Sequence, residues 1–403
     1  MDSTQRHILL ADFTLEGHHF AFLCQFSRAL LAEGHVVTCA VPGSKKIQQW
    51  IEVNCAGEQE RFHEVEVLAP IHNGSGWLRE KLSGIQAWVS RTALVRAVEN
   101  SVGMPVDLLF FAWLDEILDR RTHPFLIDII FPYKFSGLYF HPYHLRKTEK
   151  FLNRRAVWRD FDAPLLSKRC IGVAVHDRGI ADAFSKRLAK PVIHFPETAD
   201  ATPPQPHHPL AEAIRHQAKD RIVVGIIGCE KHKGFLNLIR AIKGTDETRF
   251  YFALIGILPE SSYDPDSWRE ITNFLASTPE NVLTHFHSLR EGEEYNSVFC
   301  SFDIIYLVYA DFISSSNRLT KAAHFGRLVL AQDNYCIGSD VREFDLGETV
   351  RPGDPNAIVQ GLCKLERRIR ESCFPLEQWR MYRELNSEEI LALKFKELLS
   401  TLN

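Results

Sequence analysis

Several signatures of membrane, metal and dinucleotide-binding proteins are missing from this sequence of 403 residues. No apolar run reaches the ~18 residues that a helix needs to span a bilayer. No G-x-G-x-x-G motif follows a predicted strand, which argues against an NAD-dependent dehydrogenase. The nine cysteines include no C-x-x-C pair and show no zinc-ligand spacing with histidine. The net charge of −4 argues against nucleic acid as a main partner, because such a partner requires a basic face.

The composition indicates a globular protein of the cytoplasm. Apolar residues make up 45% of the chain and charged residues 24%, which is typical of a soluble domain. Most cysteines lie inside apolar runs, so we expect buried, reduced thiols in a reducing compartment. The chain passes from Met1 directly into a predicted strand at 7–12, and we therefore expect no signal peptide. Its length exceeds one ordinary core and predicts two domains.

The N-terminal half alternates predicted strands and helices. A strand at 7–12, a helix at 20–33 that ends at Gly34, and a strand at 36–41 form a β-α-β unit of a parallel, doubly wound sheet. More strands are predicted at 108–112, 126–131, 137–140, 171–175 and 191–195, with helices at 85–99 and 178–188. This half is expected to form a Rossmann-like domain over residues 1–196.

A proline-rich segment separates the two halves. Four prolines lie within seven residues, and such a run resists both helix and sheet: Pro203, Pro204, Pro206 and Pro209. We therefore predict a linker at 197–209 and a second Rossmann-like domain at 210–386, with strands at 221–227, 250–255, 281–285, 304–308 and 328–330. The helical tail 387–403 is expected to pack back on the first domain. Two such domains predict a ligand-binding cleft between them.

Two loops of the second half follow buried strands. The polar run 314–317 precedes a short predicted helix, whose free amides and dipole can bind an anion. The alternative is that these serines and the asparagine only cap a structural helix. The other loop, 228–234, places Lys233 at the carboxyl end of a strand, where open α/β sheets bind ligands. A surface lysine near a turn is the alternative there.

The first half has two further candidate regions. The loop 15–19 follows the first strand, and His141 follows the strand at 137–140; a tight turn, solvated histidines or a core histidine are the alternatives. Basic and aromatic residues are also concentrated at 77–82 and 144–155, together with Trp88, Arg91 and Arg96. They can contact anionic lipid or receive a phosphorylated substrate, or they can form a solvated basic face.

Four segments of the second half carry a family resemblance. They are the loop 228–234 with its Lys233-Gly234 pair, the segment 290–305, the helix and strand at 321–331, and the run 347–355, which reads G-x-x-V-x-P-G-D-P. In this order they resemble the donor domain of family-4 glycosyltransferases, which have the GT-B architecture of two facing Rossmann-like domains. Gly17 and the G-H-x-V run at 34–37 match the first domain of that family.

The resemblance implies an enzyme that moves a sugar from a nucleotide-sugar donor, UDP-linked by expectation, to a hydroxyl of a sugar, glycan or lipid-linked acceptor. It implies retention of anomeric configuration, no metal or other cofactor, and a role in polysaccharide or glycoconjugate synthesis in the cytoplasm, with weak peripheral contact at the inner membrane face as an option. The expected donor-binding residues are Gly17, Glu230, Lys231, Lys233, Leu289, Arg290, Ser315, Ser316, Asn317, Leu319 and Thr320. If the enzyme inverts instead, the candidate bases are Glu16, His18, Asp115 and His141.

The sequence departs from the family pattern at three places. The family has two glutamates eight residues apart, whereas Ile313 and Lys321 stand at those positions here. The family's arginine in the loop at 228–234 also has no counterpart. These departures keep two alternatives open: a non-catalytic nucleotide-sugar-binding or scaffold protein, and a nucleotide-sugar epimerase of the same architecture.

Overall fold

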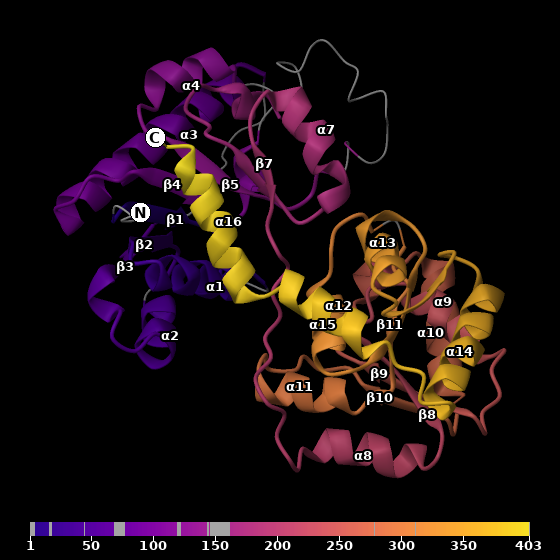
Figure 1. Cartoon of the computed structure of the whole chain (residues 1–403). Helices are drawn as coiled ribbons and strands as arrows, with labels where there is room; N and C mark the ends of the chain where they lie inside the picture. Colours follow the sequence, from indigo (N-terminus) through magenta and orange to yellow (C-terminus); the bar gives the residue numbers. More distant parts are fainter. Residues whose placement is uncertain are drawn as a thin grey trace. The chain divides into compact units, whose positions relative to one another are not determined.

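The computed structural model in Figure 1 describes residues 5–15, 18–43, 45–67, 77–118, 122–142, 145, 162–277, 279–310 and 312–402, without the side chains of His18 and of residues 77–83. The chain folds into two compact units. The first comprises Met1–Pro196 and Glu388–Asn403, and the second comprises Glu197–Ser387. The proline-rich segment belongs to the second unit, where Glu197 and Thr198 are buried.

The first unit is built on a parallel sheet of seven strands in the order β3-β2-β1-β4-β5-β6-β7. The strands are β1 (His7–Ala11), β2 (Val36–Val41), β3 (Phe62–Glu66), β4 (Leu108–Phe111), β5 (Phe135–Tyr139), β6 (Val173–Val175) and β7 (Val192–His194). The strand order reverses beside β1, which pairs with both β2 and β4. The loops that leave the carboxyl ends of β1 and β4 therefore flank the switch point, where such sheets bind ligands.

Helices pack against this sheet because most of its strands are apolar on both faces. The longer ones are α1 (His18–Ala32), α2 (Lys46–Asn54), α3 (Trp77–Val102), α4 (Pro124–Ile130), α7 (Arg178–Leu188) and α16 (Glu388–Ser400). The C-terminal helix α16 lies along α1 in Figure 1 and contacts it. The Phe395 ring of α16 lies 5.4 Å from that of Phe26 and 5.2 Å from that of Phe110, so the tail is part of the core of the first unit.

The second unit has a parallel sheet of six strands in the order β10-β9-β8-β11-β12-β13. They are β8 (Ile222–Ile227), β9 (Phe250–Ile255), β10 (Val282–His285), β11 (Ile304–Leu307), β12 (Leu328–Gln332) and β13 (Gly347–Val350). Around the sheet lie α8 (Pro209–Ala218), α9 (Phe235–Ile242), α10 (Pro265–Ala276), α11 (Glu293–Cys300), α12 (Asn317–His324), α13 (Tyr335–Glu343), α14 (Pro355–Arg370) and α15 (Leu376–Leu385). The predicted α/β class with two doubly wound parallel sheets is confirmed.

One predicted strand is wrong. Residues 126–131 were expected to form a strand because they are almost continuously apolar, but 126–130 belong to helix α4 and Phe131 is its C-cap. Pro124 occupies the first turn, where its missing N–H costs no hydrogen bond. The ring Nδ1 of His123 accepts a hydrogen bond from the amide of Phe125 at 3.2 Å and caps the helix. A short apolar run does not distinguish the two structures, and the start signals decide for the helix.

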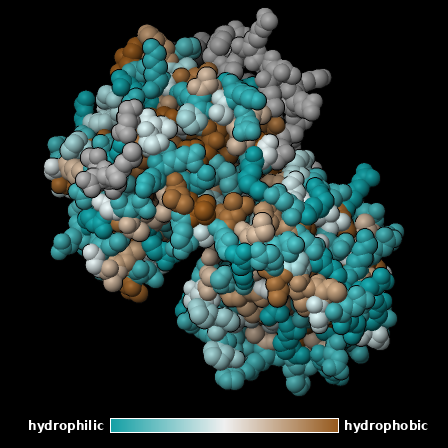
Figure 2. Space-filling view, viewed as in Figure 1, coloured by the Kyte–Doolittle hydropathy of each residue, from teal (hydrophilic) through white to brown (hydrophobic). Residues whose placement is uncertain are grey.

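The basic and aromatic residues of α3 do not form a single surface face. Trp88 is buried, with its ring 5.0 Å from that of Phe135, and the Arg91 guanidinium lies 4.8 Å from the Trp88 ring. Arg96, by contrast, is exposed. The face of the molecule in Figure 2 is largely hydrophilic, with apolar atoms in small groups. Within the described part of the chain, no helix is long and apolar enough to cross a bilayer.

Candidate functional site

The loop after β8 lies at the carboxyl edge of the second sheet. A short 3-10 helix, Lys231–Lys233, ends at Gly234, whose φ of +75° is left-handed. A side chain at Gly234 would clash with the backbone oxygen of Val308, which follows β11, so only glycine lets the loop lie this close. The close approach fixes Lys233 beside the switch point between β8 and β11. Its Nζ lies 2.9 Å from the Glu230 carboxylate.

The Lys233 ammonium group is largely buried, and the positive charge of Arg318 lies near it. Only 17% of its side chain is exposed. Burial lowers the pKa of Lys233, and the nearby positive charge of Arg318 lowers it further. Burial opposes ionisation of Glu230, but the ion pair with Lys233 outweighs this and lowers the pKa of the carboxyl group. The 2.9 Å contact thus pairs the ammonium group of Lys233 with the carboxylate of Glu230.

Arg318, in the first turn of α12, brings a second positive charge to this edge. Its Nε donates to the hydroxyl of Tyr295 on α11 at 3.0 Å, and its Nη1 donates to the hydroxyl of Tyr309, which follows β11, at 3.1 Å. Both acceptors are phenol hydroxyl groups. Among the residues that the structure describes, no carboxylate forms an ion pair with Arg318, and its Nη2 has no hydrogen-bond acceptor. Sequence reasoning missed Arg318, although it lies inside the predicted polar loop and helix start.

Lys321, at the position of the family's second glutamate, points into the protein. The residue is 2% exposed, and its Nζ donates to the Asn296 side-chain oxygen at 2.5 Å. The same Nζ lies 4.4 Å from the centroid of the Tyr295 ring, an attractive cation–π distance. Burial lowers the pKa of Lys321. This lysine therefore connects α12 to α11 and supports the Tyr295 ring from inside the protein, so it does not face a ligand.

The predicted anion site at the start of α12 already holds an internal carboxyl group. Ser315 donates its hydroxyl hydrogen to Glu197, and the backbone amide of Asn317 donates to the same side chain. Glu197 is only 6% exposed, and burial raises its pKa to about 8. Its backbone amide donates to the Asn386 side-chain oxygen at 3.1 Å. Two of the predicted donor groups are thus occupied by Glu197 in this structure.

The other predicted donor-binding residues belong to different parts of the second unit. Lys231 turns towards α10 and forms an ion pair with Asp264 at 3.1 Å. Ser316 lies with its hydroxyl oxygen 3.5 Å from that of Tyr309, in the same cluster as Arg318. The remaining four are two buried residues of α12 and two in the loop before α11: Leu319, Thr320, Leu289 and Arg290.

In the first unit, Asp115 organises the carboxyl end of β5. Its two carboxylate oxygens accept hydrogen bonds from the amides of Phe140 and His141, both at 2.8 Å. The His141 ring nitrogen lies 3.5 Å from the same carboxylate. The structure therefore brings these two predicted residues together. The other predicted groups of this edge, Glu16, Gly17 and the side chain of His18, lie outside the described residues.

His19 is the residue at this edge that sequence reasoning did not select. Its Nδ1 lies 3.0 and 2.9 Å from the two carboxylate oxygens of Asp12, which is buried at the end of β1. Its ring stacks on that of Trp113 at 4.1 Å. Such a carboxylate fixes the tautomer that protonates Nδ1 and leaves Nε2 free to accept a proton. The pair can thus act as a general base.

Comparisons with known proteins identify the architecture. No protein-family model matches the sequence, and no curated protein is similar to it. Solved structures do match over essentially the whole chain. A glycosyltransferase from Rickettsia africae superimposes with a TM-score of 0.69 at 13% identity, covering 100% of both chains. The chain has the GT-B fold.

Two further GT-B structures support this assignment. Sucrose-phosphate synthase from Thermosynechococcus elongatus matches with a TM-score of 0.68 and 15% identity, covering 99% of each chain. Anabaena HepE, in complex with UDP and glucose, matches with a TM-score of 0.64 and 14% identity, covering 98% of this chain and 100% of its own. At these identities the likeness establishes the GT-B fold, and side chains must carry any statement about the site.

One group of side chains in this GT-B chain has the chemistry of a metal site. Asp12, His19 and Glu116 each offer a ligand atom, and these atoms lie within 4.8 Å of one another; no other such group occurs within the described ranges. Partial desolvation and the Asp12 charge raise the pKa of Glu116. The direct hydrogen bond between Asp12 and His19 explains their contact without an ion. The group can hold a divalent cation through its nitrogen and oxygen donors.

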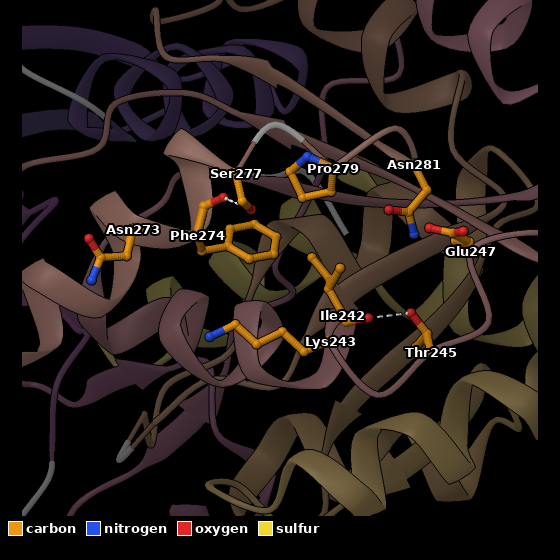
Figure 3. Close-up of a pocket in the computed structure, with 9 residues that line it drawn as sticks. All are labelled: Ile242, Lys243, Thr245, Glu247, Asn273, Phe274, Ser277, Pro279 and Asn281. Atoms are coloured by element: carbon orange, nitrogen blue, oxygen red, sulfur yellow. Dashed lines mark hydrogen bonds between the residues drawn. The ribbon is translucent and has the colours of Figure 1, made fainter.

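A hollow of about 420 Å³ lies at the opposite, amino-terminal edge of the second GT-B sheet (Figure 3). Its two hydroxyl groups are satisfied locally: that of Thr245 donates to the Ile242 carbonyl at 2.8 Å, and that of Ser277 donates to the Phe274 carbonyl at 2.6 Å. Parallel sheets bind ligands at the other edge. The residues of this hollow are therefore not assigned to the candidate site.

Proposed function

We propose that the chain is a glycosyltransferase that moves a sugar from a nucleotide-sugar donor to a hydroxyl acceptor. The observation that carries this proposal is the pair of positive charges, Lys233 and Arg318, at the switch point of the second GT-B sheet. UDP is the nucleotide that we propose. The Anabaena HepE structures contain UDP or UDP-glucose, and an Escherichia coli structure of similar fold contains UDP-2-fluoro glucose.

The chemistry requires positive charge where the donor breaks. The bond between the anomeric carbon and the diphosphate oxygen breaks, the acceptor oxygen bonds to that carbon, and the nucleoside diphosphate leaves with an additional negative charge. Preorganised cations in a half-buried site stabilise that developing charge. We propose that Lys233 performs this role. Basic side chains then balance the negative charge of the leaving diphosphate, without a resident metal.

The acceptor proton can leave by two routes, which differ in stereochemistry. The resemblance to family-4 enzymes implies retention, with the proton passing to a phosphate oxygen of the leaving group. We propose this route. Inversion would instead require a side-chain base, for which the paired Asp12 and His19 are the best placed of the described residues in the first unit. The configuration of the product, read by proton NMR, distinguishes the two.

The residues at the two family glutamate positions, 313 and 321, favour a second candidate function. Lys321 is buried against the Tyr295 ring and Ile313 is also buried, so neither family glutamate is replaced by another carboxylate at its own position. A nucleotide-sugar-binding protein without transferase activity would have this property. Binding of a nucleotide sugar without release of nucleoside diphosphate in the presence of a broad acceptor panel would favour this candidate.

For the setting, we propose assembly of a polysaccharide or glycoconjugate in the cytoplasm, with a sugar, glycan or lipid-linked acceptor. The first experiment is a panel of UDP- and GDP-sugars, scored by thermal stabilisation, because a bound ligand raises the unfolding temperature by mass action. Donors that stabilise the protein are then tested for release of free nucleoside diphosphate. The proposal expects stabilisation by at least one UDP-sugar. No stabilisation by any nucleotide sugar would contradict it.

A further inference from the structure

We propose that Arg318 binds the diphosphate of the donor, supplying from helix α12 the second positive charge that the loop after β8 lacks. This inference rests on the proposed function and adds a residue to its site. The loop at 228–234 contains no arginine. The fold brings one to the same edge from a different element, because α12 begins at the carboxyl end of β11, the neighbour of β8 in the sheet.

The guanidinium of Arg318 is held in one orientation. Two phenolic oxygens, those of Tyr295 and Tyr309, accept from its Nε and Nη1. Both phenol rings are themselves fixed: Tyr295 is 7% exposed and lies under the Lys321 ammonium, and Tyr309 is 3% exposed, with its ring 5.0 Å from that of Phe312. A guanidinium fixed in this way is preorganised, so it loses little freedom when a ligand binds.

The charge of Arg318 is uncompensated. Lys233 and Glu230 form an ion pair that sums to zero, and the described residues contribute no carboxylate to Arg318. Taking a cation partly out of water without a partner is unfavourable. Burial is the main cause of the lowered pKa of Lys233 and of His232, and the nearby Arg318 charge lowers both further. A site with these properties favours an anion with several oxygens.

The geometry selects a phosphate ligand over a single carboxylate. The unpartnered Nη2 and the Lys233 ammonium offer donors from two separate elements, and the planar guanidinium matches the oxygens of a phosphate group. A diphosphate provides oxygens on two linked phosphorus atoms, so one ligand offers an acceptor to each cation. The alternative is a purely structural role, in which Arg318 only cross-links Tyr295 to Tyr309.

The test compares affinities for UDP and for inorganic pyrophosphate, which is only the diphosphate part of the ligand. They are measured by calorimetry on the full chain and on the variants Arg318→Gln and Arg318→Lys. Loss of a charge-assisted hydrogen bond is expected to weaken UDP binding by roughly 10- to 100-fold in Arg318→Gln. Arg318→Lys keeps the positive charge but not the planar guanidinium group, and a smaller loss of UDP affinity is expected.

Arg269→Gln serves as the control and is expected to bind UDP like the parent protein. Arg269 is an exposed arginine of α10 that is paired with Asp266.

The outcomes separate this inference from the function on which it rests. Weaker binding of both UDP and pyrophosphate by the Arg318 variants, with unfolding temperatures close to that of the parent, supports the assignment. Unchanged UDP binding in both variants overturns the inference and leaves the proposed function intact. Weaker binding of UDP with unchanged binding of pyrophosphate has the same meaning, because Arg318 would then not contact the diphosphate. If Arg318→Gln does not fold, Arg318→Lys decides by the same criterion. Failure of the parent protein to bind UDP would remove the proposed function itself.

Discussion

The hydroxyl group of Ser315 donates a hydrogen bond to the buried carboxyl group of Glu197 at the start of α12. The amide of Asn317 donates to the same carboxyl group. The Glu197 carboxyl group therefore occupies the position at which a helix N-terminus binds an anion. The chain passes from the first unit to the second at Glu197 and returns to the first unit after Ser387. The backbone amide of Glu197 donates to Asn386, so Glu197 connects the polar loop to both of these points.

Protonation of Glu197 should make stability depend on pH. Burial raises its pKa from an ordinary value of 4.5 to about 8, so the folded chain binds more protons than the unfolded chain between these values. The unfolding free energy should therefore fall as pH rises from about 5 to 8, by a few kcal/mol at most. Glu197→Gln stays neutral and should lose this component.

The measurement is chemical unfolding across that pH range, taken as the difference between parent and variant so that other titrating groups cancel. The exposed Glu212 on α8 provides a matched control, since Glu212→Gln should leave the pH dependence unchanged. A parent protein and a Glu197→Gln variant with parallel pH profiles would show that the Glu197 carboxyl group titrates normally.

Lys321→Glu restores the family's residue type and is expected to destabilise the protein without improving nucleotide binding. The position is 2% exposed, and the new carboxylate would face the Tyr295 ring and lose the hydrogen bond to Asn296. A buried, unpaired charge is expected to cost about 3–5 kcal/mol. Lys364→Glu, at a lysine that is 68% exposed, should cost at most about 1 kcal/mol. Unfolding titrations with and without UDP check this, and tighter UDP binding by Lys321→Glu would contradict the inward orientation.

The C-terminal helix offers a paired test of core packing. Phe395 is 1% exposed and lies 4.8 Å from the ring of Phe195, whereas Leu393, two residues earlier, is 54% exposed. Phe395→Ala should lower the unfolding free energy of the first unit by about 3–5 kcal/mol. Leu393→Ala should change it by no more than about 0.5 kcal/mol. Equal effects, measured by denaturant unfolding, would show that α16 does not pack in this register.

The sequence alone predicted the parallel sheets because strands covered on both faces are continuously apolar, as β8 and β9 are. It could not separate strand from helix at 126–131, where the apolar run is short. It also could not show which polar groups face each other. That Lys321 points inward, that Glu197 reaches Ser315 across 118 positions, and that Arg318 shares an edge with Lys233 all depend on tertiary packing.

The central claim is that the second unit binds a nucleoside diphosphate at Lys233, and a calorimetric titration of the full chain with UDP tests it most directly. We expect saturable binding by the parent protein, affinity at least ~10-fold weaker for Lys233→Ala with an unchanged fold, and parent-like affinity for Lys243→Ala at the opposite edge of the sheet. Absence of binding at millimolar UDP, or equal affinity for Lys233→Ala and the parent protein, would contradict the account.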